Sequence, residues 1–176
     1  VRPPDVRVTD VNSPEACEFV RSLAPDVVVV NGTNLLREPM LATGGRDKIA
    51  RVWDLATRAE LAHTEPLSGS VTDLVFSRDG QRLACGSSNW VARVWDLRDG
   101  TLRPVADDIG KVRTVAFLRS DTLIAALGEW GISLYDARTL AYQRDLGNHG
   151  EPVTRIKASP DGSMLLSLSR DSVLKL

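Results

Sequence analysis

Hydrophobic and polar residues follow one short pattern that returns along the chain. In the first copy, Ile49–Leu55, apolar residues surround one arginine and lead to a Trp-Asp pair. The second copy, Val91–Leu97, keeps the same order, and a weaker third copy, Ile132–Ala137, ends in Tyr-Asp. The aromatic residues are 95 − 53 = 42 and 135 − 95 = 40 residues apart, and a fourth copy begins at Asp171. Four copies at a period of about 40 to 45 residues predict a repeated β unit.

Each complete repeat predicts four short strands. In the second repeat these are Val71–Ser77, Arg82–Gly86, the segment that ends at Trp95-Asp96, and Thr101–Ala106. The first two are joined by Ser77-Arg78-Asp79-Gly80, where Asp and Gly suit a tight reversal. The corresponding strands of the other repeats are predicted at Val112–Leu118, Thr122–Leu127, Ala141–Leu146, Val153–Ser159, Met164–Ser169, Leu41–Gly45 and Glu60–Thr64.

From residue 41 onward, the Trp-Asp endings, the Asp-Gly turns and the repeat length resemble the WD40 repeat family. The resemblance implies a mainly β chain, a partial β-propeller with blades at about 42–66, 67–107, 108–148 and 149–176. By this count the first blade lacks its first strand, and the fourth stops before its aromatic residue, expected at 135 + 42 = 177. Closed propellers use four to eight blades, so we expect a fragment of a larger propeller with three to three and a half blades. Open blade edges would favour self-association.

Residues 1–41 follow a different pattern and predict a short β-α-β segment. Arg7–Val11 is a candidate strand, and Asn12-Ser13-Pro14-Glu15 has the residues of a helix start. Apolar residues then recur at three- and four-residue steps up to Ala24, which predicts one buried helical face. Val27–Val30 is an unbroken aliphatic run, typical of a strand covered on both faces in a parallel sheet. Leu35–Leu41 could begin another helix.

Part of this segment, about residues 5–41, resembles the formyltransferase family that uses formyl-tetrahydrofolate. The matching residues are Asp10-Val11-Asn12, the Leu23–Val30 strand entry, and Asn31-Gly32-Thr33 leading to Leu35-Leu36. The resemblance implies that the turn after the valine run would lie beside folate. The family's catalytic Asn, His and Asp have no counterpart, because the repeat takes over at about Ala42. We therefore expect any enzymatic remnant to be inert.

Two other interpretations of the first blade stay open. Val20–Ala24 could be its first strand, with Pro25-Asp26 as the turn. That strand would lie 53 − 20 = 33 residues before Trp53, whereas Val71 lies 95 − 71 = 24 before its own Trp. The spacing therefore counts against it. Alternatively, Val27–Val30 could take the place of the missing innermost strand.

The WD40 resemblance also implies a buried hydrogen-bond network in each blade, which joins a His, a Ser or Thr, an Asp and the strand-three Trp. Alignment back from each aromatic residue places these members at Thr43, Asp47 and Trp53 in the first blade, at Trp95 in the second, and at His149, Ser167 and Asp171 in the fourth. The last three could be taken for a hydrolase triad. The repeat register explains all three positions, so we interpret them as structural, and no oxyanion hole is indicated.

Partner binding is predicted for the turns between the second and third strands. Trp90 and Trp130 each lie five residues before a Trp or Tyr, and Trp is enriched at binding hot spots. Arg46 and Arg170 precede the turn Asp position and could add a cationic rim. Packing of both indoles across the seam between blades, with solvated arginines, is the simpler interpretation of the same positions.

Composition limits the classes of function. A formal net charge of −1 argues against a broad nucleic-acid-binding face, and the longest aliphatic runs are too short to span a membrane. Two histidines and two scattered cysteines give no zinc spacing, and Gly44–Lys48 lacks the spacing of a phosphate loop. We therefore expect no metal and no cofactor. Cys17 and Cys85 are interpreted as free thiols, which suits the cytoplasm.

These patterns together favour a non-catalytic scaffold that binds a protein or peptide partner. The alternative is a folate-dependent, formyltransferase-like enzyme fragment without its catalytic residues. We expect neither nucleic acid nor membrane as a partner.

Overall fold

The computed structural model describes residues 8–9, 27–33, 39–105, 112–118, 122–127, 131–170 and 174–175. These residues form strands and turns in four sheets, which we call blades one to four in chain order. Blade one holds β1 (Val8–Thr9), β2 (Val27–Thr33), β3 (Pro39–Gly45), β4 (Arg51–Asp54) and β5 (Glu60–His63). Blade two holds β6 (Val71–Phe76), β7 (Arg82–Ser87), β8 (Ala92–Asp96) and β9 (Leu102–Pro104).

The other two blades repeat this plan. Blade three holds β10 (Val115–Phe117), β11 (Leu123–Leu127), β12 (Gly131–Asp136) and β13 (Tyr142–Asn148). Blade four holds β14 (Val153–Ala158), β15 (Leu165–Ser169) and β16 (Leu174–Lys175). Within each of these sheets, neighbouring strands are antiparallel and consecutive in the chain. The strands predicted from residue 41 onward are thus confirmed, to within a few residues at their ends.

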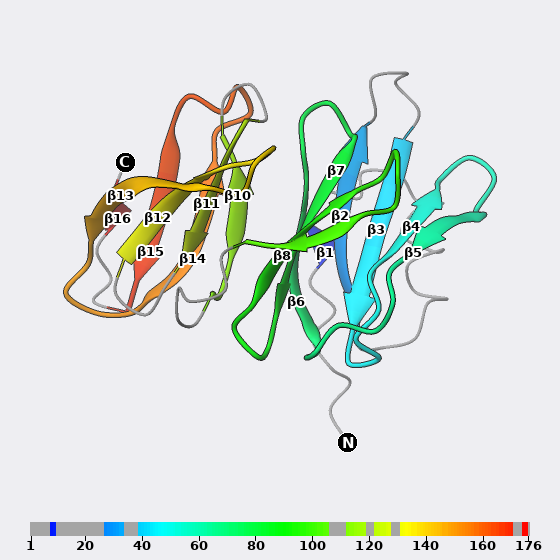
Figure 1. The fold of residues 1–176 in the computed structure, drawn as a ribbon, viewed down its shortest axis with the longest axis horizontal. Coiled ribbons are helices and arrows are strands. Elements are labelled where there is room, and N and C mark those ends of the chain that lie inside the picture. The colour runs from blue at the N-terminus through cyan, green and yellow to red at the C-terminus, as the bar shows by residue number, and fades with distance from the viewer. Residues whose placement is uncertain are drawn as a thin grey trace.

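The four blades follow one another across the molecule in chain order, with the blue and cyan strands of blade one at one end and the orange and red strands of blade four at the other (Figure 1). The first strands of successive blades contact each other, β6 with β10 and β10 with β14. Strand β2 contacts β6 in the same way. The repeat therefore extends over all four sheets with one shared inner row of strands.

Strand β2 occupies the place of the first strand in blade one. It pairs antiparallel with β3 along its whole length, from Val27 opposite Gly45 to Thr33 opposite Pro39. On its other edge it pairs parallel with β1. The valine run thus takes the place of the missing first strand of the repeat, with β1 added at its other edge, and it does not lie inside an all-parallel sheet. One sheet therefore crosses the boundary that the sequence placed near residue 41.

The predictions for residues 10–26 lie outside the described residues, including the helix after Asn12 and the alternative strand at Val20–Ala24. The suggested helix at Leu35–Leu41 is wrong in its last part. Residues 39–41 belong to β3, where they pair with β2 on one side, and Met40 and Leu41 also pair with β4 on the other. Two sheet partners satisfy the backbone groups that a helix would have to satisfy internally.

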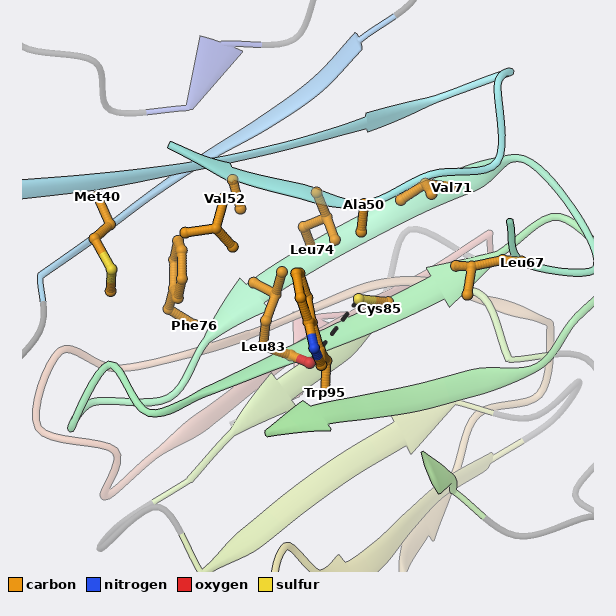
Figure 2. Packing of buried hydrophobic residues seen from close by; sticks show 11 residues of the cluster. Met40, Ala50, Val52, Leu67, Val71, Leu74, Phe76, Leu83, Cys85 and Trp95 are labelled. Carbon is orange, nitrogen blue, oxygen red and sulfur yellow. Dashed lines mark hydrogen bonds between the residues drawn. The ribbon is translucent and has the colours of Figure 1, made fainter. Parts of the chain in front are cut away.

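The core is divided into three clusters, each at a seam between blades. Figure 2 shows the first, where Trp95 of blade two packs with side chains of both blades, including Val52 of blade one and Leu83. At the next seam Tyr135, in the equivalent position, is fully buried. The third seam is aliphatic and includes Ile132, Leu134 and Ile156. The strand-three aromatic residues therefore hold a blade to the preceding blade.

The Asp of each Trp-Asp or Tyr-Asp pair closes the turn that follows strand three. The Oδ1 atom of Asp54 accepts the backbone N–H groups of Ala56 and Thr57, each at 2.8 Å. Asp96 and Asp136 accept equivalent N–H groups, from Arg98 at 3.0 Å and from Arg138 at 2.8 Å. The turns then pass through positive φ at Arg58, Gly100 and Leu140. The repeated carboxylate is thus a turn cap.

Candidate functional site

Trp90 lies in the β7–β8 turn, at a positive φ of 72°. Its backbone N–H donates to the Ser87 carbonyl at 2.9 Å, and its own carbonyl accepts the Val112 N–H at 3.0 Å. The Cζ atom of Arg113 lies 4.8 Å from the centroid of the indole ring, within the range of a cation–π contact. Arg113 leads into β10, so this contact crosses the seam between blades two and three. A contact of this kind is expected if the indole packs across the seam between blades. Partner binding by Trp90 stays a prediction.

The other residues predicted for partner binding lie on the equivalent turns of other blades. Arg46 is exposed in the β3–β4 turn. Arg170 is exposed after β15, and its N–H donates to the Pro152 carbonyl at 3.1 Å. Trp130 lies outside the described residues. The structure therefore places Arg46, Trp90 and Arg170 in equivalent turns of blades one, two and four, with both arginines two repeat positions before that of Trp90.

In blade one, the implied network is present in part. The Trp53 Nε1–H donates to Thr43 Oγ1 at 2.8 Å, and the Thr43 side chain is buried. The Asp47 carboxylate instead accepts from Arg51 Nη1 at 2.5 Å and from the Ile49 N–H at 3.3 Å. Thr43 and Trp53 thus link two strands of the blade, while Asp47 orders the turn.

In blade two, a thiol replaces the hydroxyl. Cys85 is fully buried in the same cluster as Trp95. Burial raises the pKa of the Cys85 thiol to about 12. Only the thiolate is a good nucleophile, so a buried thiol with this pKa is chemically inert.

We therefore expect Cys85 to resist thiol reagents in the native protein. In a Cys17→Ser background at pH 8, a disulfide reagent should label Cys85 only after denaturation with guanidinium. The time course of labelling with and without denaturant measures this, and a Ser87→Cys variant gives a second buried thiol for comparison. Rapid native labelling of Cys85 would contradict its placement in the seam.

In blade four, His149 and Ser167 lie together as the repeat register predicted. His149 Nε2 is 2.8 Å from Ser167 Oγ, and both side chains are buried. His149 Nδ1 has no hydrogen-bond partner among the described residues. Asp171 lies outside the described residues. Both side chains line a cavity of about 630 Å³ whose other walls are largely aliphatic residues of blades three and four, such as Leu123 and Leu134.

Asp73 is a structurally important residue that the sequence analysis missed. Its Oδ2 atom accepts the Val115 N–H at 3.0 Å, and its Oδ1 atom accepts the Leu74 N–H at 3.1 Å. Burial raises the pKa of the Asp73 carboxyl above its usual value, although these hydrogen bonds act against the increase. Asp73 therefore joins blade two to blade three directly. Its only sequence signal is a carboxylate inside a strand that is otherwise largely apolar.

Among the described residues, no group of three or more His, Cys, Asp or Glu side chains is arranged to hold a metal ion. A search of the same residues finds no helix with the length and apolar character of a membrane span.

Comparison with known proteins places the repeats in a family. The model of the family described as WD domain, G-beta repeat matches residues 16–54, 59–96 and 141–176. The chain belongs to the WD40 repeat family. The first matched WD40 repeat begins at residue 16, inside the segment that resembled a formyltransferase, and nothing in the comparisons supports that resemblance. The WD40 match passes over residues 97–140, where the structure nevertheless forms most of blade three.

Three relatives illustrate the similarity of this WD40 chain to longer proteins. It is 26% identical over 131 residues to the U3 small nucleolar RNA-associated protein 15 homolog of Xenopus tropicalis, covering 73% of this chain and 25% of that protein. It is 31% identical over 98 residues to protein tipD of Dictyostelium discoideum, covering 55% of this chain and 16% of that protein. It is 30% identical over 173 residues to a guanine nucleotide-binding protein subunit beta of Arabidopsis thaliana, covering 90% of this chain and 45% of that protein. The WD40 chain thus spans less than half the length of these relatives.

Proposed function

We propose that this WD40 chain is a non-catalytic interaction module that binds a protein or peptide through the turns between the second and third strands of its blades. The observation that carries the proposal is the Trp90 turn. The Trp90 backbone is fixed there by two hydrogen bonds, and its indole ring contacts the Arg113 guanidinium. A fixed aromatic side chain loses little conformational entropy on binding, which suits a hot spot.

The repeat extends this surface to neighbouring blades. Arg46 and Arg170 lie on the equivalent turns, and Trp130 takes the same sequence position in blade three. Such a surface would combine aromatic anchors with a polar rim, as protein interfaces commonly do. Relatives support the general role, because one similar protein is named as the beta subunit of a guanine nucleotide-binding protein.

Mutation of the indoles tests the site. Proteins crosslinked to the wild-type chain in cell extract should be lost, or reduced at least about tenfold, with Trp90→Ala and Trp130→Ala, as quantified by mass spectrometry. Leu61→Ala is the matched control, because Leu61 is an exposed apolar residue on β5, away from these turns. If both Trp variants keep every partner while Leu61→Ala behaves identically, the turns are not the binding surface.

The folate-dependent alternative rests on the sequence of residues 5–41 alone. Titration with tetrahydrofolate, followed by calorimetry, separates the two functions. We expect no binding heat, and a saturable heat would favour the alternative.

A further inference from the structure

A polar cleft of about 380 Å³ lies at the seam between blades two and three, beside the turns that follow β8 and β12. It is lined by Arg82, Asp96, Arg98, Asp99, Thr101, Arg103 and Arg138. Among the described lining residues, four arginines and two aspartates give a formal charge of 4 − 2 = +2, in a chain whose overall charge is −1. The cleft is therefore a local concentration of positive charge.

Both carboxylates in the cleft are already engaged within their own turn. Asp96 accepts from Arg98 through both oxygens, Oδ1 from Nε at 2.9 Å and Oδ2 from Nη2 at 2.6 Å. The Arg98 guanidinium lowers the pKa of the Asp96 carboxyl to about 2, so this pair stays charged above that pH. Asp99 accepts the hydroxyl of Thr101 at 2.7 Å and its backbone N–H at 2.9 Å.

Arg82 Nε and Arg98 Nη2 lie 4.0 Å and 2.6 Å from Asp96 Oδ2, which leaves Arg103 and Arg138 as the other two cations of the cleft. Neither has a carboxylate within 4.0 Å among the described residues. Arg103 Nη2 instead donates to the backbone carbonyl of Arg138 at 2.9 Å, which fixes its guanidinium across the seam beside the turn that carries Arg138. Both residues are exposed, and like charges that line one cleft repel each other unless an anion lies between them.

We propose that this cleft binds a phosphate monoester, carried by a phosphorylated side chain of a partner peptide. A phosphate monoester has close to two negative charges at pH 7, which matches the charge of the cleft. Arginine forks bind phosphate oxygens in pairs of parallel hydrogen bonds. A peptide is favoured over RNA, because none of the described residues that line the cleft is aromatic and could stack on a base, and the whole chain is not basic.

The phosphate cleft is distinct from the proposed Trp90 surface. Trp90 precedes β8, whereas Arg98 and Asp99 follow it, so the two sites lie at opposite ends of one strand. Loss of one site is therefore expected to leave the other unchanged. Phosphate binding in the cleft therefore does not require partner binding at the Trp90 turn.

Titration of the isotope-labelled full chain tests the proposal through the arginine Nε–H signals in nuclear magnetic resonance spectra. The probes are inorganic phosphate, a phosphoserine peptide, the same peptide with serine or glutamate, and a single-stranded oligoribonucleotide, all at pH 7.5 and a fixed ionic strength of about 0.1 M. We expect saturable shifts with inorganic phosphate and the phosphoserine peptide. The combined Arg103→Gln and Arg138→Gln variant should weaken binding at least about tenfold.

A matched control separates the site from charge alone. The combined Arg58→Gln and Arg144→Gln variant also removes two charges, from exposed positions outside the cleft, and should bind as wild type. Thermal unfolding must show that both variants are folded. Absence of saturable binding, equal binding of the unphosphorylated peptide, binding of the oligoribonucleotide alone, or a loss below tenfold in the cleft variant would each overturn the proposal.

Discussion

Replacement of Trp95 by alanine should lower the free energy of unfolding by about 3–5 kcal/mol, the largest effect expected for any substitution considered. Trp95 is only 2% exposed and belongs to the cluster of buried side chains from blades one and two (Figure 2). Removal of the ring would leave a cavity that rigid β-sheets cannot collapse to fill, so the loss includes both transfer and cavity energy. Urea denaturation followed by circular dichroism measures the change.

Two further variants identify the cause of this loss. Trp95→Tyr introduces the residue type that blade three has at the equivalent position, Tyr135. This variant should retain roughly half of the stability that Trp95→Ala loses. Trp90→Ala removes an equally large ring from a turn, where a cation–π contact contributes about 1 kcal/mol or less. If Trp95→Ala cost no more than Trp90→Ala, the seam would not depend on the strand-three aromatic residues.

The sequence predicted the strands well because the Trp-Asp pair fixes a register. Once Trp53, Trp95 and Tyr135 are aligned, the other strands of each repeat can be located by their nearly constant distance in sequence from these residues. Blade three shows the strength of this spacing, since the WD40 family match passes over residues 97–140 and the strands there are still found. A period of about 40 residues constrains position even where individual residues depart from the family pattern.

Strand β2 shows where the sequence interpretation was incomplete. Val27 lies 53 − 27 = 26 residues before Trp53, close to the 95 − 71 = 24 of blade two, and a five-residue connection follows each strand, 34–38 and 77–81. The spacing therefore contained the signal for a first strand. The unbroken valine run favoured a parallel sheet instead, because the local sequence pattern does not determine which strand will be the neighbour.

Two side chains that the sequence did not single out make contacts between blades that no local pattern contains. Asp73 bonds to a backbone N–H 42 residues later, and Arg103 to a carbonyl 35 residues later. The repeat register brings Thr43 to Trp53 and His149 to Ser167, but it did not predict that the Asp47 carboxylate accepts from Arg51. The repeat thus predicts which positions are equivalent. How the side chains at these positions pair depends on the residues that each blade contains.

Replacement of Gly44 by alanine should destabilise the protein by about 2–3 kcal/mol through overpacking. A Cβ atom at Gly44 would lie 2.6 Å from Val71 Cγ1 and 2.7 Å from Val71 Cβ. Val71 is buried at the seam between blades one and two, and its Cβ is held by the backbone of β6, so rotation of the side chain cannot relieve the contact. The two blades would have to move apart, which also loosens the packing around Trp95.

Two other glycines give a graded control for Gly44→Ala. Gly86 is the equivalent residue of blade two, where a new Cβ would meet Asp73 Cβ at 3.3 Å, so a small shift suffices and the loss should be smaller. Gly150 has no atom within 4 Å of a new Cβ, and alanine there should be neutral or stabilising by up to about 1 kcal/mol, through the lower entropy of the unfolded chain. Urea denaturation should therefore rank the variants Gly44→Ala, Gly86→Ala and Gly150→Ala from least to most stable. Equal stability of all three would mean that the seam between blades one and two is not closely packed, because only close packing distinguishes a contact at 2.6 Å from open space.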